Sequence, residues 1–225
     1  MNPLLPWGLI ALSYFIGSIP IGVLVAKAKG IDITQVGSGN VGATNVARVL
    51  GKGPGLAVFL LDVCKGLVPC LLAANLTSTP VLGMMTRQDF AFVCGVLAML
   101  GHMFSPFLKF KGGKGIATGL GMLFGAAPLV AVASFGVFLV LMAISRIVSL
   151  SSIVATVVMI STGFLLSNSM IGQWVLLGVG AFVLIKHIPN MKRLREGTEA
   201  KFSFGSKKAD AAASTEEGKG SSTDS

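Results

Sequence analysis

The sequence predicts an all-α integral membrane protein with seven transmembrane helices, the fourth of them short. Its N-terminus is expected on the outer side of the membrane and its C-terminus in the cytoplasm. Hydrophobic residues make up 53% of the chain and charged residues only 12%, and the mean hydropathy is +0.81. A soluble domain could not bury so much apolar surface, whereas each helical membrane span needs about 20 apolar residues. The order of the apolar segments and the placement of the positive charges support the same fold class.

The expected spans follow one another along the chain. The first is too long, and its start too poor in Lys and Arg, for a cleaved signal peptide. The fourth is short and rich in glycine, and Gly125 and Pro128 separate it from the fifth. A five-span arrangement remains open if the fourth segment is re-entrant and its neighbour is misjudged. The seven segments are 4–26, 56–76, 90–108, 116–126, 129–145, 150–167 and 171–186.

The positive charges favour seven spans with the N-terminus outside. This arrangement places every Lys and Arg on the inner side except Arg87, which lies outside, and Lys65, which lies within a span. Cytoplasmic loops of membrane proteins carry such an excess. The net charge of +9 therefore indicates membrane topology and attraction for anions and anionic lipids, and not nucleic-acid binding.

The chain divides into a membrane-embedded domain, residues 1–202, and a tail, residues 203–225. The tail consists largely of Gly, Ser, Ala, Lys and Glu without apolar periodicity, so we expect a disordered cytoplasmic segment. Three cysteines, Cys64, Cys70 and Cys94, lie in apolar stretches without CxxC spacing, which predicts buried thiols and no metal site.

Asp62 and Lys65 are spaced to share one face of the second span. An unpaired charge in a bilayer is costly, so we expect the two to pair with each other. Proton handling or substrate contact remains the alternative.

The first polar motif follows the first span and ends in Arg48. Gly39 permits a left-handed backbone and close approach to a ligand, while Ser38, Asn40 and Asn45 offer hydroxyl and amide contacts. Such a loop before a helix can bind phosphate through backbone N–H groups, with Arg48 closing the site. An ordinary Gly/Asn turn is the alternative.

The second motif places Lys111 and Lys114 on either side of a glycine pair just before the fourth span. The helix dipole and both ammonium groups could face one anion. The spacing is not that of a nucleotide P-loop, so ATP or GTP binding is disfavoured. His102 could orient this loop by hydrogen bonding, or could simply end its helix.

The third motif, His187 to Asn190, ends the last span, and a polar break at Arg146–Ser149 lies between the fifth and sixth spans. His187 is a candidate general base, and a capped helix end is the alternative. The seven-span arrangement brings all three motifs and the break to the cytoplasmic face. Four polar segments on one surface indicate a single site for a phosphorylated small molecule.

Together these motifs resemble the bacterial membrane acyltransferases of the PlsY family, which move a fatty acyl group from acyl phosphate to glycerol 3-phosphate. The resemblance covers about residues 8–202. Met191 stands where Ile is more usual, Lys186 where Arg is frequent, and the tail is additional. The matching positions are Gly37–Val46 and Arg48; Gly101, His102, Phe110–Gly115, Ala117 and Thr118; and Lys186–Asn190, Arg193, Leu194, Gly197 and Glu199.

The resemblance implies an acyl-phosphate–glycerol-3-phosphate O-acyltransferase that makes lysophosphatidic acid and phosphate, the first step of phospholipid biosynthesis, in a bacterial inner (plasma) membrane. It implies glycerol 3-phosphate, acyl phosphate and membrane lipids as partners, without nucleic acid, nucleotide, metal or cofactor. An enzyme that makes acyl phosphate is a further candidate partner. By position, the residues implied at the substrate or the reacting centre are Ser38, Arg48, Lys111, Ser149, His187 and Asn190.

These residues suggest roles in the reaction. Arg48 and Lys111 would hold phosphates and stabilise the oxyanion, while Ser38, Ser149 and Asn190 would orient the glycerol. Either His187 or a substrate phosphate would take the proton. The phosphate is slightly favoured, because an activated donor needs only a weak base.

Two other functions remain open from the sequence. A transporter of organic phosphates would share the spans and cations, but its polar site would lie at the midplane, within inverted repeats that are not detected here. An acyl-CoA or acyl-carrier-protein enzyme would be expected to carry HxxxxD. Phe107 and Lys192 stand where that motif would place the carboxylate after His102 and His187.

Overall fold

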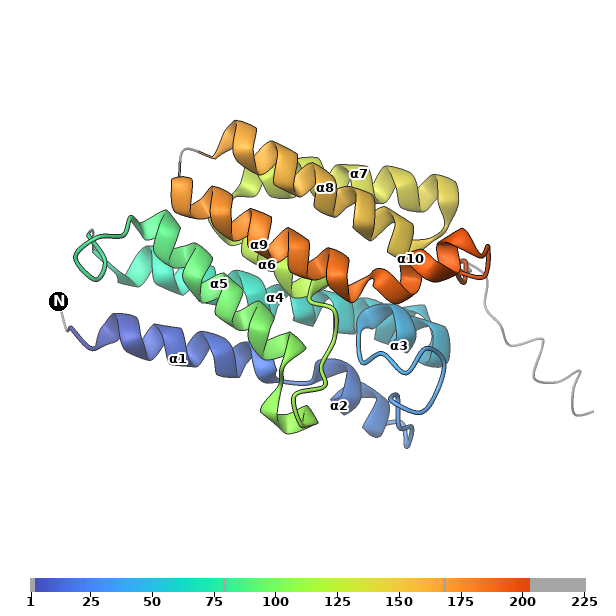
Figure 1. Cartoon of the computed structure of the whole chain (residues 1–225). Helices are drawn as coiled ribbons and strands as arrows, with labels where there is room; N and C mark the ends of the chain where they lie inside the picture. The colour runs from blue at the N-terminus through green and yellow to red at the C-terminus, as the bar shows by residue number, and fades with distance from the viewer. Residues whose placement is uncertain (1–2, 79, 168, 203–225) are drawn as a thin grey trace, which may run out of the picture.

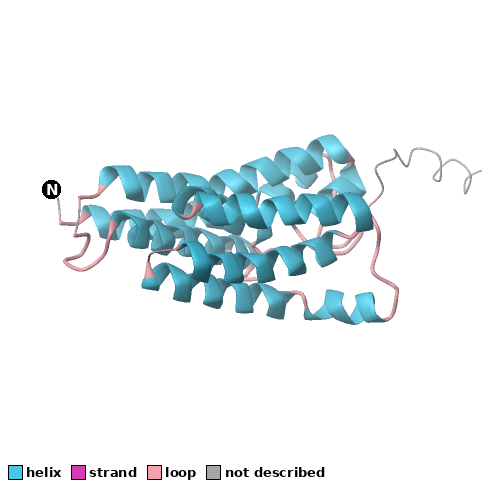
Figure 2. Ribbon diagram, turned by 90° about the horizontal axis from the view of Figure 1, so that it is seen from above, coloured by secondary structure: helices cyan, strands magenta, loops and turns pink. Residues whose placement is uncertain are grey.

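The computed structural model describes residues 3–78, 80–167 and 169–202, and there it is an elongated bundle of helices along a common axis (Figures 1 and 2). Within these residues, the only extended pairing is one β-bridge between Val81 and Met85. The all-α prediction is therefore confirmed. The expected disordered tail, 203–225, lies outside the described residues.

Long helices alternate in direction along the chain, as expected of successive spans (Figure 1). They are joined by short helices at one end of the bundle. The elements are α1 (Leu5–Ser18), α2 (Ile21–Lys27), α3 (Ala43–Leu50), α4 (Lys52–Leu76), α5 (Arg87–Met103), the 3₁₀ turn η1 (Pro106–Leu108), α6 (Ile116–Ala126), α7 (Pro128–Ser145), α8 (Val148–Leu166), α9 (Met170–Lys186) and α10 (Ile188–Arg195).

Every expected span corresponds to a helical segment, but the segments differ in length. Within the described residues, five segments are long and apolar enough to cross a membrane, and α9 with α10 makes a sixth if that bent pair counts as one span. The seventh, α6, has 11 residues. It lies inside the bundle and continues the alternation of direction (Figure 1). The number that cross the bilayer, and their orientation, stay predictions.

The helix boundaries depart from the expected spans: α4 and α5 begin earlier, at Lys52 and Arg87, and three further places differ. The first span is broken at Ile19–Pro20 into α1 and α2, because proline cannot continue the hydrogen-bond ladder. The third ends at Met103, and η1 replaces its last turn. The expected polar break at Arg146–Ser149 is shorter: Arg146 adopts a left-handed conformation and α8 begins at Val148.

Close glycine contacts hold the centre of the bundle together. A Cβ on Gly66 of α4 would lie 2.0 Å from the Thr118 carbonyl of α6, and one on Gly121 would lie 1.9 Å from the Val63 carbonyl of α4. No larger residue fits these crossings without separating the helices. Small residues are the usual means of close helix packing in lipid.

The remaining predictions for residues of α4 and α5 are partly confirmed. Asp62 and Lys65 pair as predicted, with Lys65 Nζ 2.9 Å from Asp62 Oδ1. The prediction of buried thiols holds for Cys70 and Cys94 but is wrong for Cys64, which is exposed. Cys64 lies on the outward face of α4, because its neighbours Asp62 and Lys65 occupy the inward face.

Candidate active site

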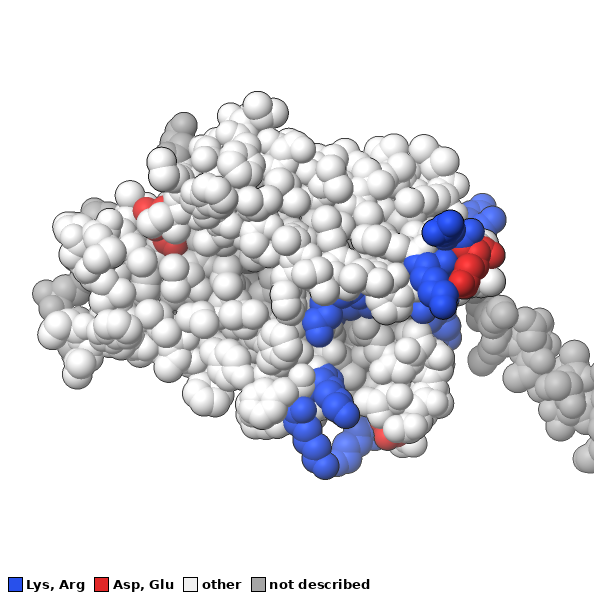
Figure 3. All heavy atoms as spheres, in the orientation of Figure 1, with Lys and Arg blue, Asp and Glu red and all other residues white. Residues whose placement is uncertain are grey.

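The three polar motifs lie at the same end of the bundle, near α2, α3 and α10 (Figure 1). On the face shown in Figure 3, Lys and Arg gather on this half of the molecule and none is visible on the other. Arg87, at the start of α5, belongs to the opposite end. The structure therefore brings together the segments that the sequence assigned to one surface.

The first motif is held in shape by Asn45. The Asn45 Oδ1 accepts a hydrogen bond from the Ser38 N–H at 2.8 Å, and its Nδ2 donates to the Ile33 and Val36 carbonyls at 3.2 and 3.0 Å. The side chain is 1% exposed. Its amide is thus engaged within the protein, where it shapes the loop, and its predicted contact with substrate stays a prediction.

The rest of this loop presents groups to solvent. The Asn40 Oδ1 accepts from the Gly42 N–H at 2.8 Å, directly before α3, and Gly39 is left-handed with φ +68°. The side chains of Ser38 and Arg48 are exposed. Internal hydrogen bonds therefore fix the shape of the loop, while polar side chains on its surface face solvent.

The second motif, here called the glycine loop (residues 109–115), packs on the end of α5. The N–H groups of Gly112 and Gly113 donate to the Met103 and His102 carbonyls at 3.0 and 3.1 Å. A Cβ on Gly113 would lie 2.2 Å from His102 Nε2. The glycine pair is thus required for packing, which leaves Lys111 exposed at the surface.

A polar network joins the second and third motifs through Glu199. Lys114 Nζ donates to Asn190 Oδ1 at 2.5 Å, and Asn190 Nδ2 donates to Glu199 Oε1 at 2.6 Å. The same carboxylate accepts from Ser149 Oγ at 2.7 Å and from Arg193 Nε at 2.6 Å. One carboxylate therefore fixes side chains from α8, α10 and, through Asn190, the loop before α6.

The charged groups of this network shift the pKa values of Lys114 and Glu199. Burial lowers the pKa of Lys114; the Glu199 carboxylate opposes that shift, while the Arg193 and Arg48 charges add to it. Burial would raise the pKa of Glu199, but hydrogen bonds from Ser149, Asn190 and Arg193 outweigh it and hold that pKa below its usual range. The carboxylate stays charged beside cations that outnumber it.

His187 lies outside α9, at a 53° bend between α9 and α10. Its Nδ1 lies 2.8 Å from the Val183 carbonyl. Because a carbonyl only accepts, Nδ1 carries the hydrogen, and in the neutral ring Nε2 keeps its lone pair. Burial lowers the pKa of His187, against the opposing Val183 hydrogen bond, so the ring is neutral at neutral pH.

The glycerol-3-phosphate acyltransferase family profile matches residues 7–197. The chain belongs to this family. It is 41% identical to the glycerol-3-phosphate acyltransferase of Geobacter sulfurreducens, covering 86% of this chain and 96% of that protein. It is 46% identical to the one of Thermosynechococcus vestitus, covering 85% and 93%.

The structural comparison agrees with the family. A crystal structure of PlsY (YgiH), described as an integral membrane glycerol 3-phosphate acyltransferase in its glycerol 3-phosphate form, superposes with a TM-score of 0.81. The identity is 40%, over 88% of this chain and 96% of that one. The lysophosphatidic acid form of PlsY gives a TM-score of 0.78 at 39% identity, over 88% and 95%. Integral membrane architecture, acyltransferase class and a place in phospholipid synthesis follow.

The family resemblance seen in the sequence is therefore confirmed, while its residue roles stay predictions. Hydrogen bonds bring Lys114, Ser149 and Asn190 together. In the described part of the chain, no hydrogen bond or ion pair joins the side chains of Ser38 or Lys111 to this network.

Sequence reasoning gave no role to Glu199, although it belongs to the matching positions. The sequence did contain an indication that Glu199 has a role. Glu199 follows a run of Lys and Arg, where a carboxylate is the natural partner of the surrounding cations.

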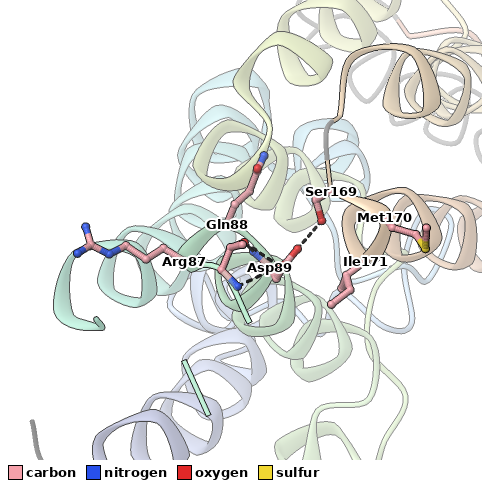
Figure 4. Close-up of a pocket in the computed structure, with 7 residues that line it drawn as sticks. Arg87, Gln88, Asp89, Ser169, Met170 and Ile171 are labelled. Atoms are coloured by element: carbon pink, nitrogen blue, oxygen red, sulfur yellow. Dashed lines mark hydrogen bonds between the residues drawn. The ribbon is translucent and has the colours of Figure 1, made fainter. Parts of the chain in front are cut away.

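A hollow lies at the opposite end of the bundle (Figure 4). It is an open pocket of about 680 Å³ lined by residues at the starts of α5 and α9, among them Asp89 and Ser169. The Asp89 carboxylate accepts hydrogen bonds from Thr86 and Ser169, and with Thr86, whose Oγ1 accepts from the Asp89 N–H, it forms the capping box of α5. These bonds use the carboxylate to hold two helix starts together, so we do not assign the chemistry to this end.

Proposed function

We propose that this protein transfers a fatty acyl group from acyl phosphate to the 1-hydroxyl of sn-glycerol 3-phosphate, which yields 1-acylglycerol 3-phosphate (lysophosphatidic acid) and phosphate. The family, and the related PlsY structures in forms named for glycerol 3-phosphate and lysophosphatidic acid, support the acceptor and the product. We infer acyl phosphate as the donor. The lack of an HxxxxD motif after either histidine favours it over acyl-CoA.

The observation that carries the proposal is the excess of cations at one end of the bundle. Glu199 is paired with Arg193 and is linked to Lys114 through Asn190. Arg48 and Lys111 belong to the motifs at the same end of the bundle, and both side chains are exposed. Both proposed substrates carry a phosphate. A site with more cations than carboxylates attracts such anions and offsets charge as the oxyanion forms.

The reaction is a displacement at an activated carbonyl. The 1-hydroxyl oxygen attacks the acyl carbon, an ester C–O bond forms, the C–O bond of the mixed anhydride breaks, and phosphate leaves with the bonding electron pair. Arg48 and Lys111 hold the phosphates. Ser38, Ser149 and Asn190 orient the glycerol, and the last two are already fixed by Glu199, which lowers the entropic cost of the attack.

The hydroxyl proton passes to a substrate phosphate. His187 is only 2% exposed, which favours a supporting role over that of the base. In its neutral form, Nε2 accepts a hydrogen bond from the acceptor substrate and holds it in place. A leaving phosphate can take the proton because the anhydride is already activated and needs no strong base.

A small apolar cleft of about 70 Å³ offers room for part of a fatty acyl chain. It lies among α4 to α9 and is lined at one end by Gly115 and Val183 and farther along by Phe135 and Met159. Gly115 directly follows Lys114, and the Val183 carbonyl accepts the His187 hydrogen bond. An acyl chain in this cleft would present its carbonyl carbon at the cation-rich end.

We place the reaction at the cytoplasmic face of a bacterial inner membrane, with residues 1–202 forming the catalytic domain. The excess of Lys and Arg at the end that carries the motifs supports this orientation. Removal of 203–225 is expected to leave acyl transfer intact.

The test is acyl transfer by the purified full-length protein in detergent. Palmitoyl phosphate and glycerol 3-phosphate are supplied together, with palmitoyl-CoA as a parallel donor. The proposal predicts phosphate and lysophosphatidic acid from palmitoyl phosphate and no product from palmitoyl-CoA. Product from palmitoyl-CoA alone would overturn the donor. No product from either, with uptake of glycerol 3-phosphate into proteoliposomes, would indicate a transporter.

A further inference from the structure

A cluster of buried charged and polar side chains lies inside the bundle and takes no part in the proposed reaction. It consists of Asp62 and Lys65 of α4 and His102 of α5. Lys65 Nζ lies 2.9 Å from Asp62 Oδ1 and 3.1 Å from His102 Nδ1. The exposed fractions of Asp62 and Lys65 are 2% and 5%. The cluster is therefore enclosed by protein.

Lys65 ties α4 to the break in the first span. Its Nζ donates to the Ile19 carbonyl at 2.8 Å, at the point where Pro20 interrupts the helix ladder between α1 and α2. On its other side the ammonium faces His102 Nδ1, and an ammonium can only donate. Nδ1 is thus the acceptor, and the ring hydrogen sits on Nε2.

His102 ties this cluster to the glycine loop. Its Nε2 edge lies under Gly113, where a Cβ would come within 2.2 Å. Its carbonyl accepts the Gly113 N–H at 3.1 Å, and the next carbonyl, of Met103, accepts the Gly112 N–H. A continuous chain of contacts therefore runs from Ile19 through Lys65 and His102 to the loop that carries Lys111 and Lys114.

The cost of burying these groups indicates a role beyond filling space. Replacing a buried ion pair by apolar residues of similar size is often neutral or stabilising, whereas removing one partner alone is strongly destabilising. Apolar residues in place of Asp62 and Lys65 would fill the same volume, but they would make no directed hydrogen bond to fix the orientation of the His102 ring.

We propose that Asp62, Lys65 and His102 are positioning residues. They hold the glycine loop, and with it Lys111 and Lys114, in the correct position relative to the rest of the site. The effect on acyl transfer rests on the proposed function. The effect on the loop does not, because Gly112 and Gly113 are held by hydrogen bonds to other residues of the protein.

The experiment compares the wild type with the double variant Asp62→Leu/Lys65→Met, which removes both charges together. Two quantities are measured: amide hydrogen exchange of the peptide containing Gly112 and Gly113, and kcat for acyl transfer per folded protein. We expect exchange at the loop to rise about tenfold and kcat to fall about tenfold or more, since small misplacements of reacting groups are costly. The thermal midpoint is expected to stay within a few degrees of the wild type or to rise.

The control is Ser169→Ala, which removes the α9 hydrogen bond to Asp89 at the opposite end of the bundle. It should leave loop exchange and kcat unchanged. If the double variant does not fold, His102→Asn is used instead. It keeps an acceptor near the position of Nδ1 but lacks the Nε2 edge under Gly113, and the same two changes are expected.

The outcomes separate the two proposals. Loop exchange and kcat that match the wild type in a folded variant would overturn the positioning role. A lower midpoint with unchanged kcat and loop exchange would overturn it as well and leave a structural role. If the wild type itself makes no lysophosphatidic acid, the proposed function fails, and the loop exchange still decides the positioning role.

Discussion

The two ends of the helical bundle each carry a buried or half-buried carboxylate that ties helices together, yet only one end is suited to bind an anion. Asp89 at one end receives hydrogen bonds from the neutral donors of Thr86 and Ser169. Glu199 at the other receives them from Ser149, Asn190 and the cation Arg193. The carboxylates are alike, and their surroundings are not.

The difference lies in how the charge is balanced. At the Asp89 end the carboxylate lies at two helix starts, where the partial positive charge of the backbone favours it, and Arg87 is the one cation among the residues that line the pocket there. At the Glu199 end the charges of Lys114, Arg193 and Arg48 act on one another. A closed network of neutral donors stabilises a fold, while a network with surplus cations leaves room for a substrate phosphate.

The largest effect is expected from removing a cation of the glycine loop. Lys111→Met should lower kcat/KM for acyl transfer by about 100-fold or more, the usual loss when one group that stabilises the developing oxyanion is removed. The matched control is Lys109→Met in the same loop, which should stay within about twofold of the wild type. Equal losses in the two variants would show that loop charge in general, and not Lys111, matters.

A second comparison neutralises one carboxylate at each end. Glu199→Gln should lower kcat about tenfold, because it removes the charge and the oxygen that bind Arg193 and leaves only a neutral, weaker acceptor for Asn190 and Ser149. Asp89→Asn should lower the thermal midpoint with kcat unchanged, because it weakens the joint between α5 and α9. Steady-state kinetics and thermal unfolding on both variants check this. Loss of kcat in Asp89→Asn alone would reverse the assignment of the two ends.

His187 gives a prediction about pH. Its folded-state pKa is lowered from the usual 6.5, so the unfolded chain binds the proton more readily. The contribution of His187 to stability is therefore complete above about pH 6.5 and is lost as pH falls from there toward the folded-state pKa. His187→Asn should remove this part of the acid destabilisation, as followed by thermal unfolding between pH 5 and 8.

The same variant distinguishes the two candidate bases. With a substrate phosphate as base, His187→Asn should lower kcat about tenfold and leave the acid limb of the pH–rate profile in place. A loss of about 100-fold or more together with the disappearance of that limb would identify His187 as the general base.

The smallest effect is expected at the helix cap of the far end. Thr86→Ala removes the capping hydrogen bond of α5 and should cost about 1 kcal/mol of stability. Acyl transfer should not change, since Thr86 belongs to the Asp89 end. A change in kcat with Thr86→Ala would mean that the two ends are coupled.

Sequence patterns predicted the fold well where the signal was long and apolar. The span 56–76 appears as part of α4, and 129–145 and 171–186 appear within α7 and α9 almost unchanged. The errors are local backbone events. Pro20 broke the first span, and α5 ends early, before a turn in which Lys109 and Phe110 adopt the left-handed backbone that most residues avoid.

The location of the candidate site was predicted, but the hydrogen bonds that connect its residues were not. Spacing and residue type indicated which end of the bundle carries the chemistry. They could not show that Asn45 is turned inward to hold its own loop, because a buried and an exposed asparagine look alike in a sequence. Glu199 lies after α10, and only the fold brings it to Ser149 of α8.

The central claim is that the cation-rich end alone carries out acyl transfer. The most direct measurement compares Arg48→Met with Arg87→Met, one exposed cation removed from each end, with palmitoyl phosphate and glycerol 3-phosphate as substrates. The account predicts that Arg48→Met loses about 100-fold in kcat/KM and that Arg87→Met matches the wild type. Equal activity of the two variants, or a greater loss in Arg87→Met, would contradict it.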